Sequence, residues 1–296
     1  MSITTQVVVL FIVVLVGALC RRLGYFADET IRGMTQLVVN ITLPCMTVMN
    51  MQREFTREVL FGFLLTLLIS AALLVAGLLV GLALFKNRPR DRRAVLAQLT
   101  GLSNCGFMGY PIILAVNPDW MIYAVAYNIA YVAIAWTLGV SLLCGRENIT
   151  LRRVLLHPNI VSAAIGFALF ILGVTIPQMP AQALSLVGGL TTPLSMLIIG
   201  TRVYGVRPRD FADADYPIIC ALRLVAMPLA VFALLRLMPV PHAVAATVFL
   251  LTAMPGPTMT GMQAELYGGD KVFAARAIAC TTLLSLVSVP VMCMLL

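Results

Sequence analysis

The sequence predicts an all-α integral membrane protein with ten transmembrane helices, built as two inverted repeats of five helices each. Of its 296 residues, 61% are hydrophobic and only 11% are charged, whereas soluble domains carry about 25% charged residues. The mean hydropathy is +0.99, the apolar residues form long runs between short basic loops, and short motifs recur in the two halves. The net charge of +8 therefore indicates basic cytoplasmic loops rather than nucleic-acid binding.

Ten apolar runs predict transmembrane helices, each of which takes about 20 mostly apolar residues. They cover residues 6–20, 33–51, 60–85, 94–116, 121–144, 158–175, 181–201, 217–237, 243–267 and 273–295. The first run has no basic residue before it and is followed directly by Arg21 and Arg22. Because a secretory signal carries its positive charges in front, we expect this run to remain as a span with its N-terminus outside.

The loop charges test the number of spans. With the N-terminus outside, sixteen of the twenty Lys and Arg residues fall on the cytoplasmic side, three fall outside, and Arg223 lies within a span. An odd number of spans, or one span missed between two basic loops, would mix these sets. The excess of positive charge inside therefore supports ten spans with both termini on the non-cytoplasmic side.

The chain divides into two halves that repeat each other. Residues 37–44 read LVVNITLP and residues 186–193 read LVGGLTTP, identical at four of eight positions, in spans two and seven. Residues 99–102 of span four likewise match residues 251–254 of span nine. Because five is odd, the two halves are inverted, which is the construction of many secondary transporters. The predicted parts are an N-terminal repeat (1–144), a cytoplasmic linker (145–157) and a C-terminal repeat (158–296).

Spans four and nine each contain residues that interrupt a helix. Residues 101–111 of span four read GLSNCGFMGYP, in which three glycines weaken the helix and Pro111 cannot donate to the carbonyl of residue 107. Residues 254–261 of span nine read MPGPTMTG, in which Pro255 and Pro257 stop an α-helix. Non-helical backbone at this depth survives only where it is buried in protein or faces a wet cavity. We therefore expect the two breaks to meet at one site.

The half-helix that follows each break predicts an anion site. Its first N–H groups are unpaired, and they lie at the positive end of the helix dipole, which suits a carboxylate. The expected binding residues at the breaks are Asn104, Cys105 and Gly106 in span four and Met254, Pro255, Gly256 and Pro257 in span nine. An ordinary proline kink, which is common in membrane helices, explains such a paired break poorly.

Few polar side chains lie at this level of the membrane. Asn128 and Tyr131 share one face of span five because they are three residues apart, and Asn40 lies in span two. Such residues either contact a ligand or hold helices together, and for Asn40 the second role is favoured. Arg223 is the deep charge, and it either snorkels to the interface or holds a positive potential over an anion path. No Asp or Glu lies deep in a span, which argues against an ion site built on an intramembrane carboxylate.

Enzyme chemistry finds little support in the sequence. His157 and His242 are the two histidines, both near span ends, and neither an H-E-x-x-H nor a G-x-S-x-G motif is present. The seven cysteines are scattered in or beside apolar runs, without a disulfide framework or a C-x-x-C metal site. We expect no enzymatic activity, no metal site and no cofactor.

Three stretches resemble the auxin efflux carrier family, which includes the plant PIN-FORMED carriers and many bacterial permeases. They are the run from Gly101 to Pro111, the segment from Leu251 to Gly268, and the segment from Asn40 to Pro44. The resemblance covers the whole chain, and the short middle loop is similar to that of the bacterial members. It implies a protein of the bacterial inner membrane whose fold is similar to that of sodium/proton antiporters and bile-acid symporters, with spans four and nine crossing at their prolines.

The resemblance also implies how the protein works. It suggests a scaffold of spans one, two, six and seven, a mobile transport unit of spans three to five and eight to ten, and a homodimer joined through the scaffold. It places carboxylate binding at Asn104 and, less directly, at Asn128 and Tyr131. Gly256 departs from the polar side chain of the plant carriers, which argues against auxin itself. Bacterial relatives are associated with small dicarboxylates such as malonate and malate.

The leading hypothesis is a secondary transporter that moves a small organic anion by alternating access, in an elevator-like motion. Membrane lipid and a second copy of the chain are its other expected partners. A passive channel or facilitator for a small solute is the alternative, which conductance without saturation by substrate would distinguish. Sensing by a transporter-like fold is a further hypothesis.

Overall fold

Every secondary-structure element in the described part of the chain is a helix. The computed structural model describes residues 3–145, 151–204 and 213–296. The α-helices are α1 (Ile3–Arg22), α2 (Asp28–Leu37), α3 (Leu43–Asn50), α4 (Arg57–Leu84), α5 (Arg90–Gly101), α6 (Tyr110–Val116), α7 (Met121–Ile134), α8 (Val140–Cys144), α9 (Leu151–Leu155), α10 (Pro158–Leu172), α11 (Gln178–Gly189), α12 (Thr191–Val203), α13 (Asp215–Ala221), α14 (Met227–Leu237), α15 (His242–Thr252), α16 (Thr258–Tyr267) and α17 (Lys271–Cys293). Short π or 3-10 turns are η1 (Val38–Thr42), η2 (Cys105–Gly109), η3 (Pro118–Trp120), η4 (Ala135–Gly139) and η7 (Leu222–Ala226).

Seven helical segments of the described chain are long and apolar enough to cross a membrane. They are Thr5–Arg22, Arg57–Leu84, Arg90–Val116, Pro118–Cys144, Gln178–Val203, Asp215–Leu237 and Lys271–Cys293. Two shorter apolar helices, α10 and α15, lie where the sequence predicts span six and the first part of span nine. The chain is therefore an integral membrane protein, and the count of ten spans stays a prediction.

The helices extend beyond the apolar runs at their first turns. α4 begins at Arg57 rather than at residue 60, and α5 begins at Arg90 rather than at residue 94. The reason is that a charged first turn continues the helix into the polar interface without contributing to the hydropathy signal. Three basic residues of the predicted cytoplasmic loops, Arg146, Arg207 and Arg209, lie outside the described residues.

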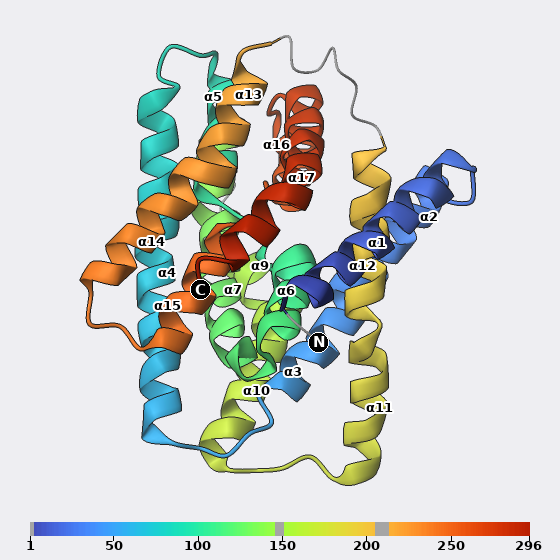
Figure 1. Ribbon diagram of the computed structural model, residues 1–296, viewed down its shortest axis with the longest axis vertical. Coiled ribbons are helices and arrows are strands. Elements are labelled where there is room, and N and C mark those ends of the chain that lie inside the picture. Colours follow the sequence, from blue (N-terminus) through green and yellow to red (C-terminus); the bar gives the residue numbers. More distant parts are fainter. Residues whose placement is uncertain (1–2, 146–150, 205–212) are drawn as a thin grey trace.

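α1 and α12 pack backbone to backbone. A Cβ on Gly200 would lie 2.0 Å from the carbonyl oxygen of Val14, and one on Gly17 would lie 2.2 Å from that of Leu197. Small residues allow this close approach, which provides the packing that lipid-exposed apolar side chains alone do not supply. In Figure 1 the α11 and α12 helices form one side of the molecule, and α4 lies at the opposite side.

The region around the end of α5 is enclosed by other helices. Every residue from 94 to 113 is buried. α4 approaches α5 so closely that a Cβ on Gly77 would lie 2.6 Å from the Cα of Gly101. Protein rather than lipid therefore surrounds the backbone at the point where α5 ends, which is the condition under which a helix can break inside a membrane.

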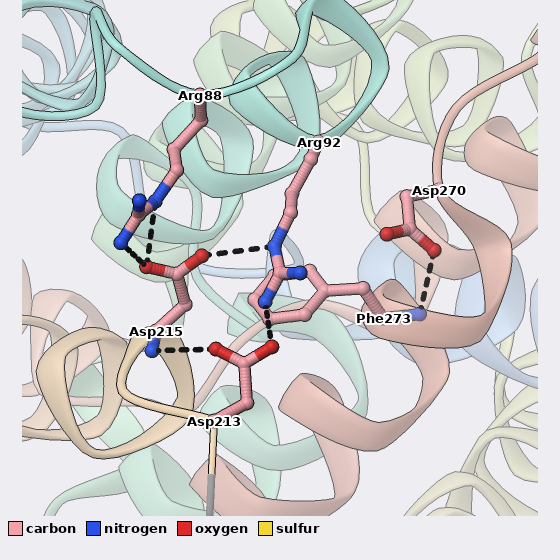
Figure 2. A network of polar contacts seen from close by, with 6 residues as sticks. All are labelled: Arg88, Arg92, Asp213, Asp215, Asp270 and Phe273. Carbon is pink, nitrogen blue, oxygen red and sulfur yellow. Dashed lines mark hydrogen bonds and ion pairs between the residues drawn. The ribbon is translucent and has the colours of Figure 1, made fainter.

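A network of ion pairs and one cation–ring contact joins three helix starts (Figure 2). Arg88, in the loop before α5, pairs with the buried Asp215 of α13 at 2.8 Å, and Arg92 of α5 pairs with the same carboxylate at 2.9 Å. Arg92 also pairs with Asp213 and lies 4.2 Å from the ring centroid of Phe273 in α17. The hydrogen bond from Arg92 holds the pKa of Asp213 below its ordinary value. The network therefore brings the α4–α5 loop together with the starts of α13 and α17, three regions that the loop charges predict to lie on one side.

Candidate functional site

The first break in the helices lies between α5 and η2. α5 ends at Gly101, residues 102–104 are not helical, and Asn104 has φ −77° and ψ 58°. The π turn η2 then leads into α6 without interruption. Pro111 lies in the first turn of α6 and therefore inside this continuous helix, and its expected part in the break stays a prediction. The chain opens at residues 102–104, before η2 begins.

The second break lies between α15 and α16. α15 ends at Thr252, residues 253–257 are not helical, and α16 begins at Thr258. Both prolines lie in this open segment, where their missing N–H groups cost no helical hydrogen bond. The two breaks are in direct contact, because the backbone N–H of Asn104 donates to the carbonyl oxygen of Pro255 at 2.9 Å.

Arg223 stabilises the ends of the two helices that lead into the breaks. Its side chain is 1% exposed, so it does not snorkel to the interface. The guanidinium donates to the carbonyl oxygens of Thr100 and Met254, each at 2.9 Å, and to that of Thr252. The carbonyls of Thr100 and Thr252 lie at the C-terminal ends of α5 and α15, and that of Met254 lies two residues beyond α15. At such ends the helix dipoles are negative and the last carbonyls lack helical partners. The guanidinium of Arg223 therefore stabilises the ends of two helices by pairing with their backbone carbonyls. A role of this charge along an anion path stays a prediction.

A small cavity lies on the other side of the two breaks. It is lined by Val39, Leu43, Asn104, Cys105, Gly106, Phe107, Asn128, Tyr131, Val132, His157, Asn159, Thr258 and Met259. Its volume is about 30 Å³, room for about two water molecules. The first residues of both half-helices, in η2 and α16, form part of its wall. Two positive helix ends thus face one small space.

The polar groups of this cavity include a buried donor without a partner. Asn104 is 4% exposed, and its side-chain nitrogen Nδ2 forms no hydrogen bond. Asn128 is held differently, because its Oδ1 accepts a hydrogen bond from the thiol of Cys105 at 3.4 Å. Asn159 contributes an amide whose Oδ1 is also without a partner. Buried polar groups are normally paired, and each exception requires an explanation. A ligand that accepts from Asn104 supplies one.

The cavity contains no charged side chain among its described lining residues. A larger cavity of about 330 Å³ lies beside the ion-pair network, between the end of α4 and α13. Its charged lining residues, Arg88 and Asp215, are paired with each other, and they leave no unpaired charge for a ligand. The smaller cavity at the breaks is therefore the stronger candidate site.

The structure brings five of the ten expected binding residues together at the cavity. Asn104, Cys105, Gly106, Asn128 and Tyr131 line the cavity. Two other groups do not line it: Asn40 is exposed in η1, and the segment Met254, Pro255, Gly256 and Pro257 is buried behind the cavity wall. The N–H of Gly256 donates to Thr281 Oγ1 at 3.2 Å, so this part of the second break is held by α17.

Eight lining residues were missed by the sequence analysis. They are Val39, Leu43, Phe107, Val132, His157, Asn159, Thr258 and Met259. Thr258 and Met259 could have been predicted from the sequence, because the unpaired N–H groups of a half-helix belong to its first residues, which follow the prolines. His157 and Asn159 carry no such signal, since they stand at the start of a separate helix about 50 residues after the first break.

Comparison with known proteins agrees with this picture. A family model described as membrane transport protein matches residues 2–149 and 147–293. The chain is also 23% identical over 292 residues to a protein of Methanocaldococcus jannaschii named as an uncharacterized transporter, and the match covers 95% of this chain and 94% of that one. Both matches point to transport and not to an enzyme. The chain belongs to the membrane transport protein family, that of the auxin efflux carriers.

Proposed function

We propose that this protein is a secondary transporter of a small organic anion, which binds in the cavity between the two helix breaks. The observation that carries the proposal is the unpaired, buried Nδ2 of Asn104 beside two positive helix ends. A carboxylate oxygen would pair with this donor and with the free N–H groups of η2 and α16. Malonate and malate are the leading candidates for the substrate.

Two contacts support an inverted repeat of five plus five spans, with spans four and nine crossing. Thr191 Oγ1 donates to Thr42 Oγ1 at 2.9 Å, and these threonines occupy matching positions in the two repeated motifs. Asn104 bonds to Pro255, the neighbour of its own match, Gly256. Contacts between matching residues are expected where a pseudo-two-fold axis passes between two halves.

The cavity walls support alternating access. Val39 and Leu43 come from span two of the proposed scaffold and His157 stands directly before α10 of that scaffold, whereas Asn104 and Thr258 come from the proposed transport unit. A cavity of about 30 Å³ is too small for malonate, so the two units must separate for the anion to enter. An elevator-like movement of one unit against the other would open it. The proposed setting is a homodimer, joined through the scaffold, in a bacterial inner membrane with both termini on the non-cytoplasmic side.

The proposal is tested by binding and transport in matched variants. Purified protein is screened by thermal shift with malonate, malate, pyruvate and indole-3-acetate, because a ligand of the folded state raises the melting temperature with concentration. The best binder is then followed as a labelled solute into proteoliposomes. We expect the uptake to saturate with substrate. Asn104→Ala should lower it at least about tenfold, because one hydrogen bond to a charged group is lost.

The matched control is Asn40→Ala, which removes an exposed asparagine away from the cavity. It should leave affinity and uptake unchanged. Uptake that is unaffected by Asn104→Ala would place the site elsewhere. Conductance that does not saturate would favour the channel alternative.

A further inference from the structure

His157 lines the cavity together with residues of both helix breaks. It precedes α10 and caps its start, and its side chain is 7% exposed. The ring packs near the indole of Trp136, with 6.1 Å between centroids. Asn104 and Thr258 contribute to the same cavity from the two broken helices. An anion bound in this cavity would therefore share it with both Asn104 and the imidazole.

The hydrogen bonding of the ring defines its tautomer. The backbone N–H of Asn159 donates to Nδ1 of His157 at 3.3 Å. Nδ1 is then the unprotonated nitrogen, and Nε2 carries the proton. Nε2 has no hydrogen-bond partner among the described residues. His157 thus adds a second unpaired donor to the residues that line the cavity, besides Asn104.

The imidazole is neutral at physiological pH. Burial lowers the pKa of His157 to about 4. The titratable side chains on the elements packed around it are Cys45 of α3, Cys105 of η2, and Tyr123, Tyr127 and Tyr131 of α7, all of types that are ordinarily uncharged at pH 7. Arg152 of α9 is exposed. No acidic side chain lines the described cavity to stabilise an imidazolium there before an anion arrives.

We propose that His157 is a ligand of the transported anion, its neutral Nε2–H donating to a carboxylate oxygen in the cavity that it lines together with Asn104. This inference rests on the proposed function. Because α10 belongs to the proposed scaffold, the bond exists only while the transport unit stands in the position seen here. A contact made in one state alone favours that state when substrate is bound. His157 therefore links substrate binding to the position of the transport unit.

Three substitutions separate the role of the donor from that of the helix cap. Asn and Asp are both good N-caps, so His157→Asn and His157→Asp keep the start of α10. The Asn variant retains a neutral donor and should bind the best carboxylate of the thermal-shift panel within about fivefold of the wild type. The Asp variant places a negative charge on the cavity wall and should bind it at least about 100-fold more weakly. His157→Ala should lose about tenfold.

A direct readout follows from the small number of histidines. His157 and His242 are the two in the chain, and His242 is exposed, so His242→Gln leaves one imidazole for nitrogen NMR. Adding the same carboxylate at constant ionic strength should shift the Nε2 signal, and chloride should not. A structural cap alone would leave Nε2 unchanged.

The outcomes distinguish the two proposals. If the carboxylate raises the melting temperature but Nε2 does not shift and His157→Ala keeps its affinity within about twofold, His157 is not a ligand and the proposed function stands. If no carboxylate of the panel stabilises the wild type at any concentration, the proposed function fails, and this inference fails with it.

Discussion

Arg223 offers the sharpest test of how the broken helices are held. Its guanidinium donates to three backbone carbonyls, of Thr100, Thr252 and Met254. In Arg223→Met a side chain of similar length removes the donors, but the carbonyls belong to the backbone and remain buried without partners. A hydrogen bond to a charged group contributes about 1.5–3 kcal/mol, so three contribute roughly 5 to 9 kcal/mol. This is comparable to the whole stability of many proteins.

The assay is the melting temperature of detergent-solubilised protein, followed by size-exclusion chromatography. We expect Arg223→Met to lower it by more than about 10 °C or to prevent isolation of folded protein. Arg223→Lys should be intermediate, since an ammonium group cannot reproduce the planar fork. Arg236→Met is the control on the same predicted span, because Arg236 is exposed and contacts the ring of Phe232. An Arg223→Met variant as stable as this control would refute the reasoning.

Three further outcomes are expected from thermal stability measurements. Gly200→Ala should lower the melting temperature strongly, because its Cβ meets the α1 backbone at 2.0 Å, whereas Gly33→Ala, with nothing within 4 Å, should have no such effect. Thr42→Val or Thr191→Val alone should lower the free energy of unfolding by about 1 kcal/mol. The double variant should lose less than the sum of the two, because both partners of one hydrogen bond are then replaced. Additive losses would contradict this. The pKa of His157 is about 4 in the folded protein and about 6.5 in the unfolded chain, so the unfolded chain binds a proton more readily. The free energy of unfolding should therefore be highest above about pH 6.5 and fall by on the order of 3 kcal/mol towards pH 4. His157→Asn should flatten that part of the pH profile.

The class of the protein and the positions of its helices follow from the sequence alone. Long apolar runs and prolines act locally, because a bilayer requires continuous apolar helix and a proline removes a hydrogen bond wherever it stands. This local logic predicted the break around Pro255 and Pro257. It also marked Asn104, whose neighbours cannot hold a regular helix.

The tertiary structure decided which side chains meet. The role of Arg223 depends on two helix ends that lie about 30 and 120 residues away from it in the chain. His157 reaches the cavity because α10 packs against α3 and α7. The chain opens at residues 102–104, and the helix of η2 and α6 continues through Pro111. Such contacts arise from the packing of distant helices, where any of several faces of an apolar helix satisfies the lipid equally well, so no local pattern selects among them.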